Sequence, residues 1–74
     1  MLRDYIYDTK FQLFIYEDNI NILNFKEIVS FSESKIIVKC QNNNLIIDGI
    51  DLIISKMLED ELLIKGKINK IEFR

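Results

Sequence analysis

Histidine is absent from the sequence. Its absence removes the usual general base near neutral pH, the Ser-His and Cys-His catalytic pairs, and the commonest metal ligand. Cys40 is the only cysteine, so no disulfide can form within the chain, and a reducing compartment such as the cytoplasm is expected. Because Cys40 lies on an apolar alternating segment, we interpret it as a core residue and not as a nucleophile. The sequence therefore predicts a protein that is not an enzyme and needs no cofactor.

Alanine, proline and tryptophan are also absent, whereas the chain contains fifteen isoleucines, five phenylalanines and three tyrosines. β-Branched and aromatic side chains fit a pleated surface, and the strongest helix former is missing. This composition predicts an all-β protein.

The chain has no excess of positive charge: ten basic and twelve acidic residues give a net charge of −2. Such a balance does not favour nucleic-acid binding or a polybasic membrane patch. No apolar run approaches the length of about 18 residues that spans a bilayer, and the first residues lack the apolar stretch of a signal peptide. We expect no direct insertion into a membrane.

Seventy-four residues predict a single β-rich domain, residues 1–74, because so short a chain buries only about 60% of its unfolded surface and cannot support two cores. Short apolar runs separated by turn residues indicate an antiparallel meander of about six strands that forms a curved sheet, a roll or a small barrel. The predicted strands are residues 11–17, 20–25, 27–31, 35–41, 45–55 and 61–73. For residues 55–63 we expect a loop with room for one helical turn.

The last two predicted strands resemble each other, because residues 45–49 (LIIDG) superpose on residues 62–66 (LLIKG) at an offset of 17 residues. In each copy an apolar triplet leads to a polar residue and a glycine. We interpret Gly49 and Gly66 as structural glycines, placed where the sheet bends sharply or where another backbone comes close.

Period-two alternation predicts a core, but it leaves a second apolar set on the opposite faces. The predicted core is Ile36, Val38, Cys40, Leu45, Ile47, Leu52, Ile54, Leu62 and Ile64. The second set could be internal, if the sheet rolls into a small barrel, or it could dock on another subunit or on a different protein. The candidate partner-binding residues are Phe14, Tyr16, Ile37, Ile46, Ile53 and Leu63.

Acidic residues allow an alternative from another functional class. Asp48, Asp51 and the run Glu59-Asp60-Glu61 could form a small-ligand or cation-binding site on a β-roll. They lack the spacing and the glycine of a calcium loop, and a run of charges is usually solvated.

The chain resembles the YabP/YqfC family of sporulation proteins from endospore-forming bacteria over about three quarters of its length, residues 18–73. The resemblance is carried by residues 22–31, 34–38, 45–54 and 61–73. Its most specific part is the ending apolar-x-Ile-x-Gly-x-Ile-x-x-Ile-Glu-Phe, which follows a Gly-x-(Asp/Asn)-Leu-x-Ile element. The chain departs from the family pattern near its start, where Tyr5, Tyr7 and Phe11 replace the expected prolines and glycine.

This resemblance implies a small β-rich protein of spore development, made in the mother cell and acting beside a membrane-protein partner. Together with the single cysteine, it leads us to expect a cytoplasmic protein held at the forespore membrane through that partner. The second apolar set also allows self-assembly into a homo-oligomer. The resemblance carries over no catalytic residue.

Overall fold

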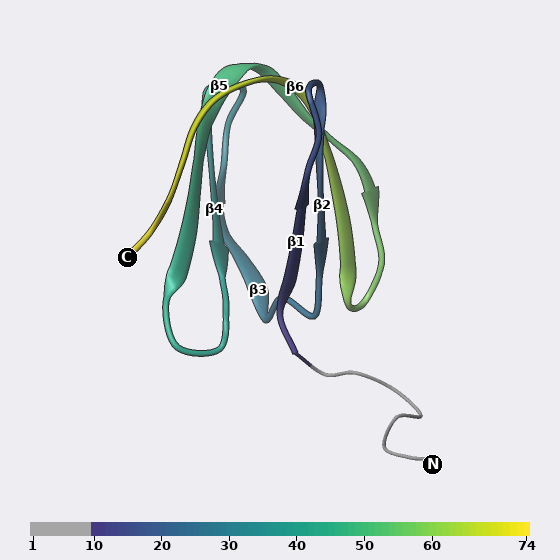
Figure 1. Ribbon diagram of the computed structural model, residues 1–74, viewed down its shortest axis with the longest axis vertical. Coiled ribbons are helices and arrows are strands. Elements are labelled where there is room, and N and C mark those ends of the chain that lie inside the picture. The colour runs from purple at the N-terminus through teal and green to yellow at the C-terminus, as the bar shows by residue number, and fades with distance from the viewer. Residues whose placement is uncertain (1–9) are drawn as a thin grey trace.

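The isoleucine-rich segments form six strands in the computed structural model, which describes residues 10–74 (Figure 1). The strands are β1 (Gln12–Ile15), β2 (Asn19–Leu23), β3 (Glu27–Phe31), β4 (Lys35–Lys39), β5 (Asn44–Met57) and β6 (Glu61–Phe73). The described residues form no helix, and the all-β prediction is confirmed. Within residues 10–74, therefore, no helix is long and apolar enough to cross a membrane. Tyr5 and Tyr7 lie outside the described residues.

The loop predicted within residues 55–63 is shorter than expected and contains no helical turn. β5 continues to Met57, and the N–H of Leu58 donates to the carbonyl oxygen of Glu61 at 2.8 Å, which leaves a two-residue turn. Pairing with β6 holds these residues extended, because tertiary pairing overrides a weak local preference for helix.

All neighbouring strands are antiparallel, in the order β1-β2-β6-β5-β4-β3. Strands β3 to β6 form the predicted meander, and the β1–β2 hairpin joins the far side of β6. Since β1 and β3 end this order, the sheet is open and curved and is not closed into a barrel.

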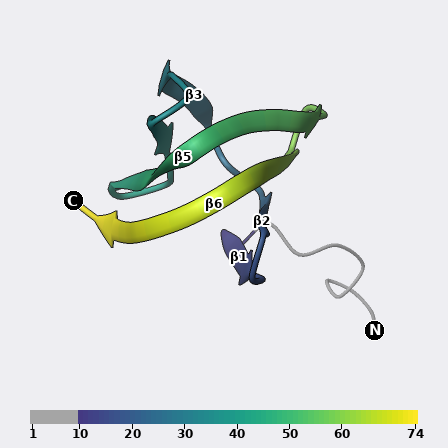
Figure 2. The ribbon, with the colours of Figure 1, turned by 90° about the horizontal axis from the view of Figure 1, so that it is seen from above.

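β5 and β6 bend near their middle, so that the sheet folds over on itself as an arch (Figures 1 and 2). The pairing of β5 with β6 shifts register between Asp48 and Gly49 and again between Ile50 and Ile53, and Asp51 has a φ of 55°. Register shifts of this kind bend a strand and increase its twist. The bend divides one sheet into two layers.

We name each layer after its central strand. The β4 layer contains β3, β4, residues 44–48 of β5 and residues 68–73 of β6. The β2 layer contains β1, β2, residues 61–65 of β6 and residues 53–57 of β5. The inner faces of the two layers meet, and their outer faces point away from each other.

The core lies between the inner faces. Its buried residues are Ile20, Ile22, Ile36, Val38, Cys40, Leu45, Ile47, Leu52, Leu62 and Ile64, and Ile54 packs against them half-buried. Full burial of each large aliphatic side chain contributes about 1.5–3 kcal/mol. The predicted core residues all belong to this cluster, and the structure adds Ile20 and Ile22 of β2 to it.

The arch has an approximate two-fold axis between β5 and β6, because exchanging β1 with β3, β2 with β4 and β5 with β6 leaves the strand order unchanged. Backbone hydrogen bonds repeat accordingly. The N–H of Gly49 donates to the carbonyl oxygen of Ser34 at 3.0 Å, and that of Gly66 donates to Asp18 at 3.2 Å. We call two positions equivalent when this axis relates them. Equivalent positions differ by 16 residues between β1 and β3 and between β2 and β4, and by 17 residues between β5 and β6.

Gly49 and Gly66 sit where the two long strands touch at the bend. A Cβ atom on Gly49 would overlap the carbonyl oxygen of Lys67 and lie 2.7 Å from Cδ2 of Leu52. A Cβ on Gly66 would lie 2.7 Å from the carbonyl oxygen of Asp51, and Gly66 has a φ of +135°, which side chains disfavour. The repeated glycine thus reflects backbone contact at two equivalent positions.

Replacing Gly49 by alanine should lower the free energy of unfolding by at least about 2 kcal/mol, because the atoms that block the new methyl group are mostly backbone. Urea denaturation followed by circular dichroism would measure this loss. Asn69→Ala is the matched control at an exposed position of β6, and it should change stability by less than about 0.5 kcal/mol. Equal stability of the two variants would contradict the glycine assignment.

Candidate functional site

The structure separates the six predicted partner-binding residues into two groups. Phe14, Ile53 and Leu63 lie on the outer face of the β2 layer, whereas Ile37 and Ile46 lie on the outer face of the β4 layer. The remaining residue, Tyr16, lies in the turn after β1, where its N–H donates to the carbonyl oxygen of Asn19 at 2.8 Å. The two outer faces must therefore be considered separately.

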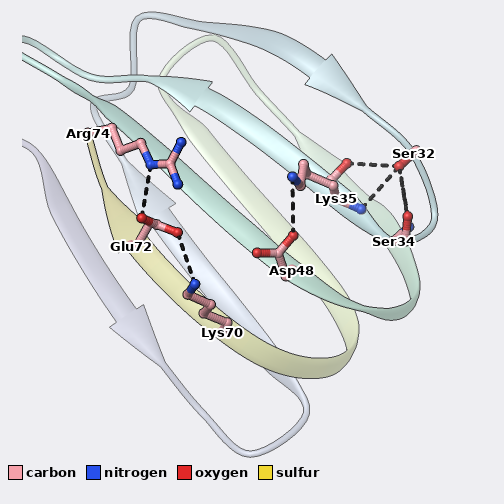
Figure 3. A network of polar contacts seen from close by, with 7 residues as sticks. All are labelled: Ser32, Ser34, Lys35, Asp48, Lys70, Glu72 and Arg74. Carbon is pink, nitrogen blue, oxygen red and sulfur yellow. Dashed lines mark hydrogen bonds and ion pairs between the residues drawn. The ribbon is translucent and has the colours of Figure 1, made fainter.

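Ile37 and Ile46 pair across β4 and β5, and both are half-buried. Charged side chains of β4, β5 and β6 on this face pair with one another (Figure 3). Lys35 Nζ lies 3.8 Å from an Asp48 carboxylate oxygen, and Glu72, which pairs with Ile46 across β5 and β6, is bound by Lys70 at 3.4 Å and Arg74 at 3.0 Å. Hydrogen bonds from Arg74, and then from Lys70, lower the pKa of Glu72. This outer face is thus covered by its own ion pairs.

The turn beside this ion-pair network is held by a serine. The hydroxyl oxygen of Ser32 accepts the N–H of Lys35 at 3.1 Å, and the N–H of Ser32 donates to the Lys35 carbonyl oxygen at 2.8 Å (Figure 3). These bonds fix the start of β4 and therefore the position of the lysine that meets Asp48. At this end of the β4 layer, the polar groups of Ser32, Lys35 and Asp48 therefore bind one another.

Among the described residues, the outer face of the β2 layer carries one ion pair, in which Lys56, the cross-strand partner of Leu63, binds Glu61 at 3.4 Å, and the rest of this face is more apolar. Phe14, Asn21 and Leu63 are direct neighbours across β1, β2 and β6, and Ile53 pairs with Lys65 in the next row. Phe14 is 41% exposed and Ile53 is 54% exposed. Lys65 has no ion-pair partner among the described residues, whereas Asp48 at the equivalent position binds Lys35. We call Phe14, Asn21, Ile53, Leu63 and Lys65 the β2-layer face.

Asn21 lies at the centre of the β2-layer face, between Phe14 and Leu63. Its Oδ1 atom is buried and accepts no hydrogen bond from any described residue. A buried acceptor without a partner costs about 1–3 kcal/mol. The equivalent position on the other face is Ile37, so the fold does not require an amide here. The β2-layer face therefore retains a polar group at the expense of stability.

Sequence reasoning missed the other exposed apolar residues, which lie on the edge strands, at the bend and at the hairpin end. They are Ile15, Val29, Phe31, Ile50, Met57, Leu58 and Phe73. Strand alternation alone does not mark them, because a strand edge is defined by strand order and not by local sequence.

The residues of the predicted cation site do not converge. Asp48 binds Lys35, and Glu61 binds Lys56 at 3.4 Å. Within residues 10–74, no group of three or more histidine, cysteine, aspartate or glutamate residues could hold a metal ion.

A polar hollow lies between the loop that joins β4 to β5 and Arg74, and Lys39 and Cys40 also line it. The thiol of Cys40 is buried, and loss of solvent raises its pKa. A raised pKa keeps the thiol protonated near neutral pH and makes it a poor nucleophile. This hollow offers no nucleophile paired with a base.

Comparison with known proteins gives one match. The family model of the YabP family matches residues 12–74, which include all six strands and every residue of the β2-layer face. The match begins at β1, earlier than the resemblance seen in the sequence. No curated protein and no solved structure matches the chain.

Replacing Asn21 by isoleucine should raise the free energy of unfolding by about 1 kcal/mol, because the change removes a buried acceptor and adds a β-branched residue. The reciprocal variant Ile37→Asn, at the equivalent position, should lower it by about 1–3 kcal/mol. Urea denaturation of both variants checks the pair. A loss of stability in Asn21→Ile would show that the amide has a structural role.

Proposed function

This chain belongs to the YabP family, and from that premise we propose that it is a sporulation protein that acts without catalysis, by binding another protein through the β2-layer face. Family membership points to sporulation. The proposed partner is a membrane protein, and the proposed place of action is the mother-cell cytoplasm, where the partner would hold the chain at the forespore membrane.

One observation carries the proposal: the β2-layer face combines exposed apolar side chains with a buried, unpaired amide oxygen at its centre. Monomeric proteins seldom retain such an arrangement unless the surface binds something. Among the described residues, the outer face of the β4 layer has three ion pairs, whereas that of the β2 layer has one, Lys56–Glu61. The difference between the two faces supports docking at one of them.

The energetics favour a partner that covers the whole face. Phe14 is 41% exposed and Ile53 is 54% exposed, so burying what remains exposed of both side chains gains about 1.5–3 kcal/mol in total. Association costs at least about 4 kcal/mol in lost translational and rotational freedom. Two side chains are therefore too few, and Leu63 and the Asn21 amide must also enter the contact. Asn21 could then rotate to find a donor on the partner.

The face also indicates what the partner must present. Lys65 is a cation without an ion-pair partner in the described part of the chain, and it lies between Ile53 of β5 and Asn19 of β2. A complementary surface would be apolar with a carboxylate near its rim, because an unpaired charge left in a contact is costly.

Leu63→Gln should abolish function while the chain stays folded. Its matched control is Ile46→Gln, because positions 46 and 63 are equivalent and both side chains are half-buried. Both variants should lose about 1–2 kcal/mol of stability. Each would be expressed in an endospore-forming bacterium that lacks its own copy of the gene, and heat-resistant spores would be counted. Only Ile46→Gln should restore spore formation.

Site-specific photo-crosslinking identifies the partner in the same strains. A photoreactive residue at position 63 should form an adduct with a membrane protein, and one at position 46 should not. Equal behaviour of the two positions in both assays, with circular dichroism showing folded protein, would contradict a docking role for the β2-layer face.

A further inference from the structure

Each layer of the arch has two edges that no described strand covers. In the β4 layer these edges are β3 and residues 68–73 of β6, and in the β2 layer they are β1 and residues 53–57 of β5. Unpaired edges expose backbone donors and acceptors to any strand of suitable direction. The arch thus has four places where a strand could be added.

We infer that copies of this chain associate side by side, with β3 of one copy pairing with residues 68–73 of β6 in the next copy. The same step would bring residues 53–57 of β5 alongside β1 of that next copy, so that both layers continue across the contact. This inference deepens the proposed function by naming a second copy of the chain as a partner. It uses the sheet edges and leaves Leu63 and Asn21 at the centre of the β2-layer face free.

The strand directions suit this contact. Every neighbouring pair is antiparallel, so the two edge strands of each four-stranded layer also run in opposite directions. Figure 2 shows β3 and β5 towards one side of the molecule and β1 and β6 towards the other. One displacement from copy to copy therefore makes two antiparallel pairs at once.

The charges of the joining edges are complementary in the β4 layer. Residues 27–33 carry two carboxylates, Glu27 and Glu33, and no cation, whereas residues 67–74 carry three cations and one carboxylate. Glu33 and Lys67 both lie at the bend, and both are exposed without an ion-pair partner among the described residues. Antiparallel pairing of β3 with β6 of the next copy brings these two residues towards each other.

The joining edges also share exposed apolar side chains. Val29 and Phe31 of β3 and Phe73 of β6 are each about half exposed, as are Ile15 of β1 and Met57 of β5. In the second joint, residues 12–16 carry no charge and residues 53–57 carry only Lys56, which Glu61 already binds. No like charges therefore meet across it.

Both joints are needed for a stable contact. β1 has four residues, and β3 has five with a register shift between Ile28 and Ser30 that shortens its regular edge. An isolated pair of strands this short is marginal in water. Because each copy presents different edges on its two sides, the contact is heterologous, and repetition produces a filament or a closed ring.

Light scattering coupled to size-exclusion chromatography, over a concentration series at low salt, tests the inference on the full chain. The mass of the unmodified protein should rise above 8.8 kDa with concentration. Glu33→Lys and Lys67→Glu should each shift the midpoint of association to at least tenfold higher concentration. The double variant, and a mixture of the two single variants, should recover most of the association.

Three results would overturn the inference: a mass of 8.8 kDa at every concentration, association unchanged by both single variants, or no recovery in the double variant. A constant mass of 8.8 kDa would mean that copies of the chain do not pair through these edges, which a strand of a different protein could then occupy. Leu63→Gln separates this inference from the proposed function, since it should associate normally while failing to restore spores. If Leu63→Gln associates normally and also restores spore formation, the proposed docking face is wrong, whereas the edge contact between copies is supported.

Discussion

The approach of two backbones at the bend determines most of this structure. Gly49 lies against the carbonyl group of Lys67, and Gly66 lies against that of Asp51, at distances that no side chain allows. The contact lies where β5 and β6 bend together, and the apolar face of the sheet is on the inside of that bend. Because the bend turns that face inward, a single sheet supplies both walls of its own core. The side chains that point away from this core form the two outer faces.

The approximate two-fold axis separates the requirements of folding from those of function. Equivalent positions on the inner faces hold similar residues, such as Ile20 and Ile36 or Leu45 and Leu62, because they fill corresponding halves of one core. On the outer faces the match is partial: Leu63 corresponds to Ile46, but Asn21 lies where the other face has Ile37. The fold gives both faces the same backbone, so it does not explain their different side chains. A difference of this kind is what selection for binding on one face would produce.

Small size makes the sheet edges important. Within residues 10–74, ten buried side chains form the core, and a chain of this length leaves much of its surface exposed. Natural proteins usually protect edge strands with charges, bulges or covering segments. Here the register shift in β3 and the lysines of residues 67–70 act in that way, and the same lysines give one edge a charge opposite to that of β3. A group that prevents random pairing can therefore also select a particular partner edge.

The sequence by itself determined the all-β class, the six strands and nearly all of the core, because alternation along a strand decides which side chains share a face. It also indicated both glycines through the repeated pentapeptide. It did not predict the strand order, in which β2 pairs with β6 across the 37 residues from Asn24 to Asp60. Only the tertiary structure placed Phe14 on the same face as Leu63 and apart from Ile37 and Ile46, although the sequence had grouped all four together. The reason is physical: local alternation is a property of neighbours in the chain, whereas an outer face is assembled from strands that meet only after the sheet has folded over.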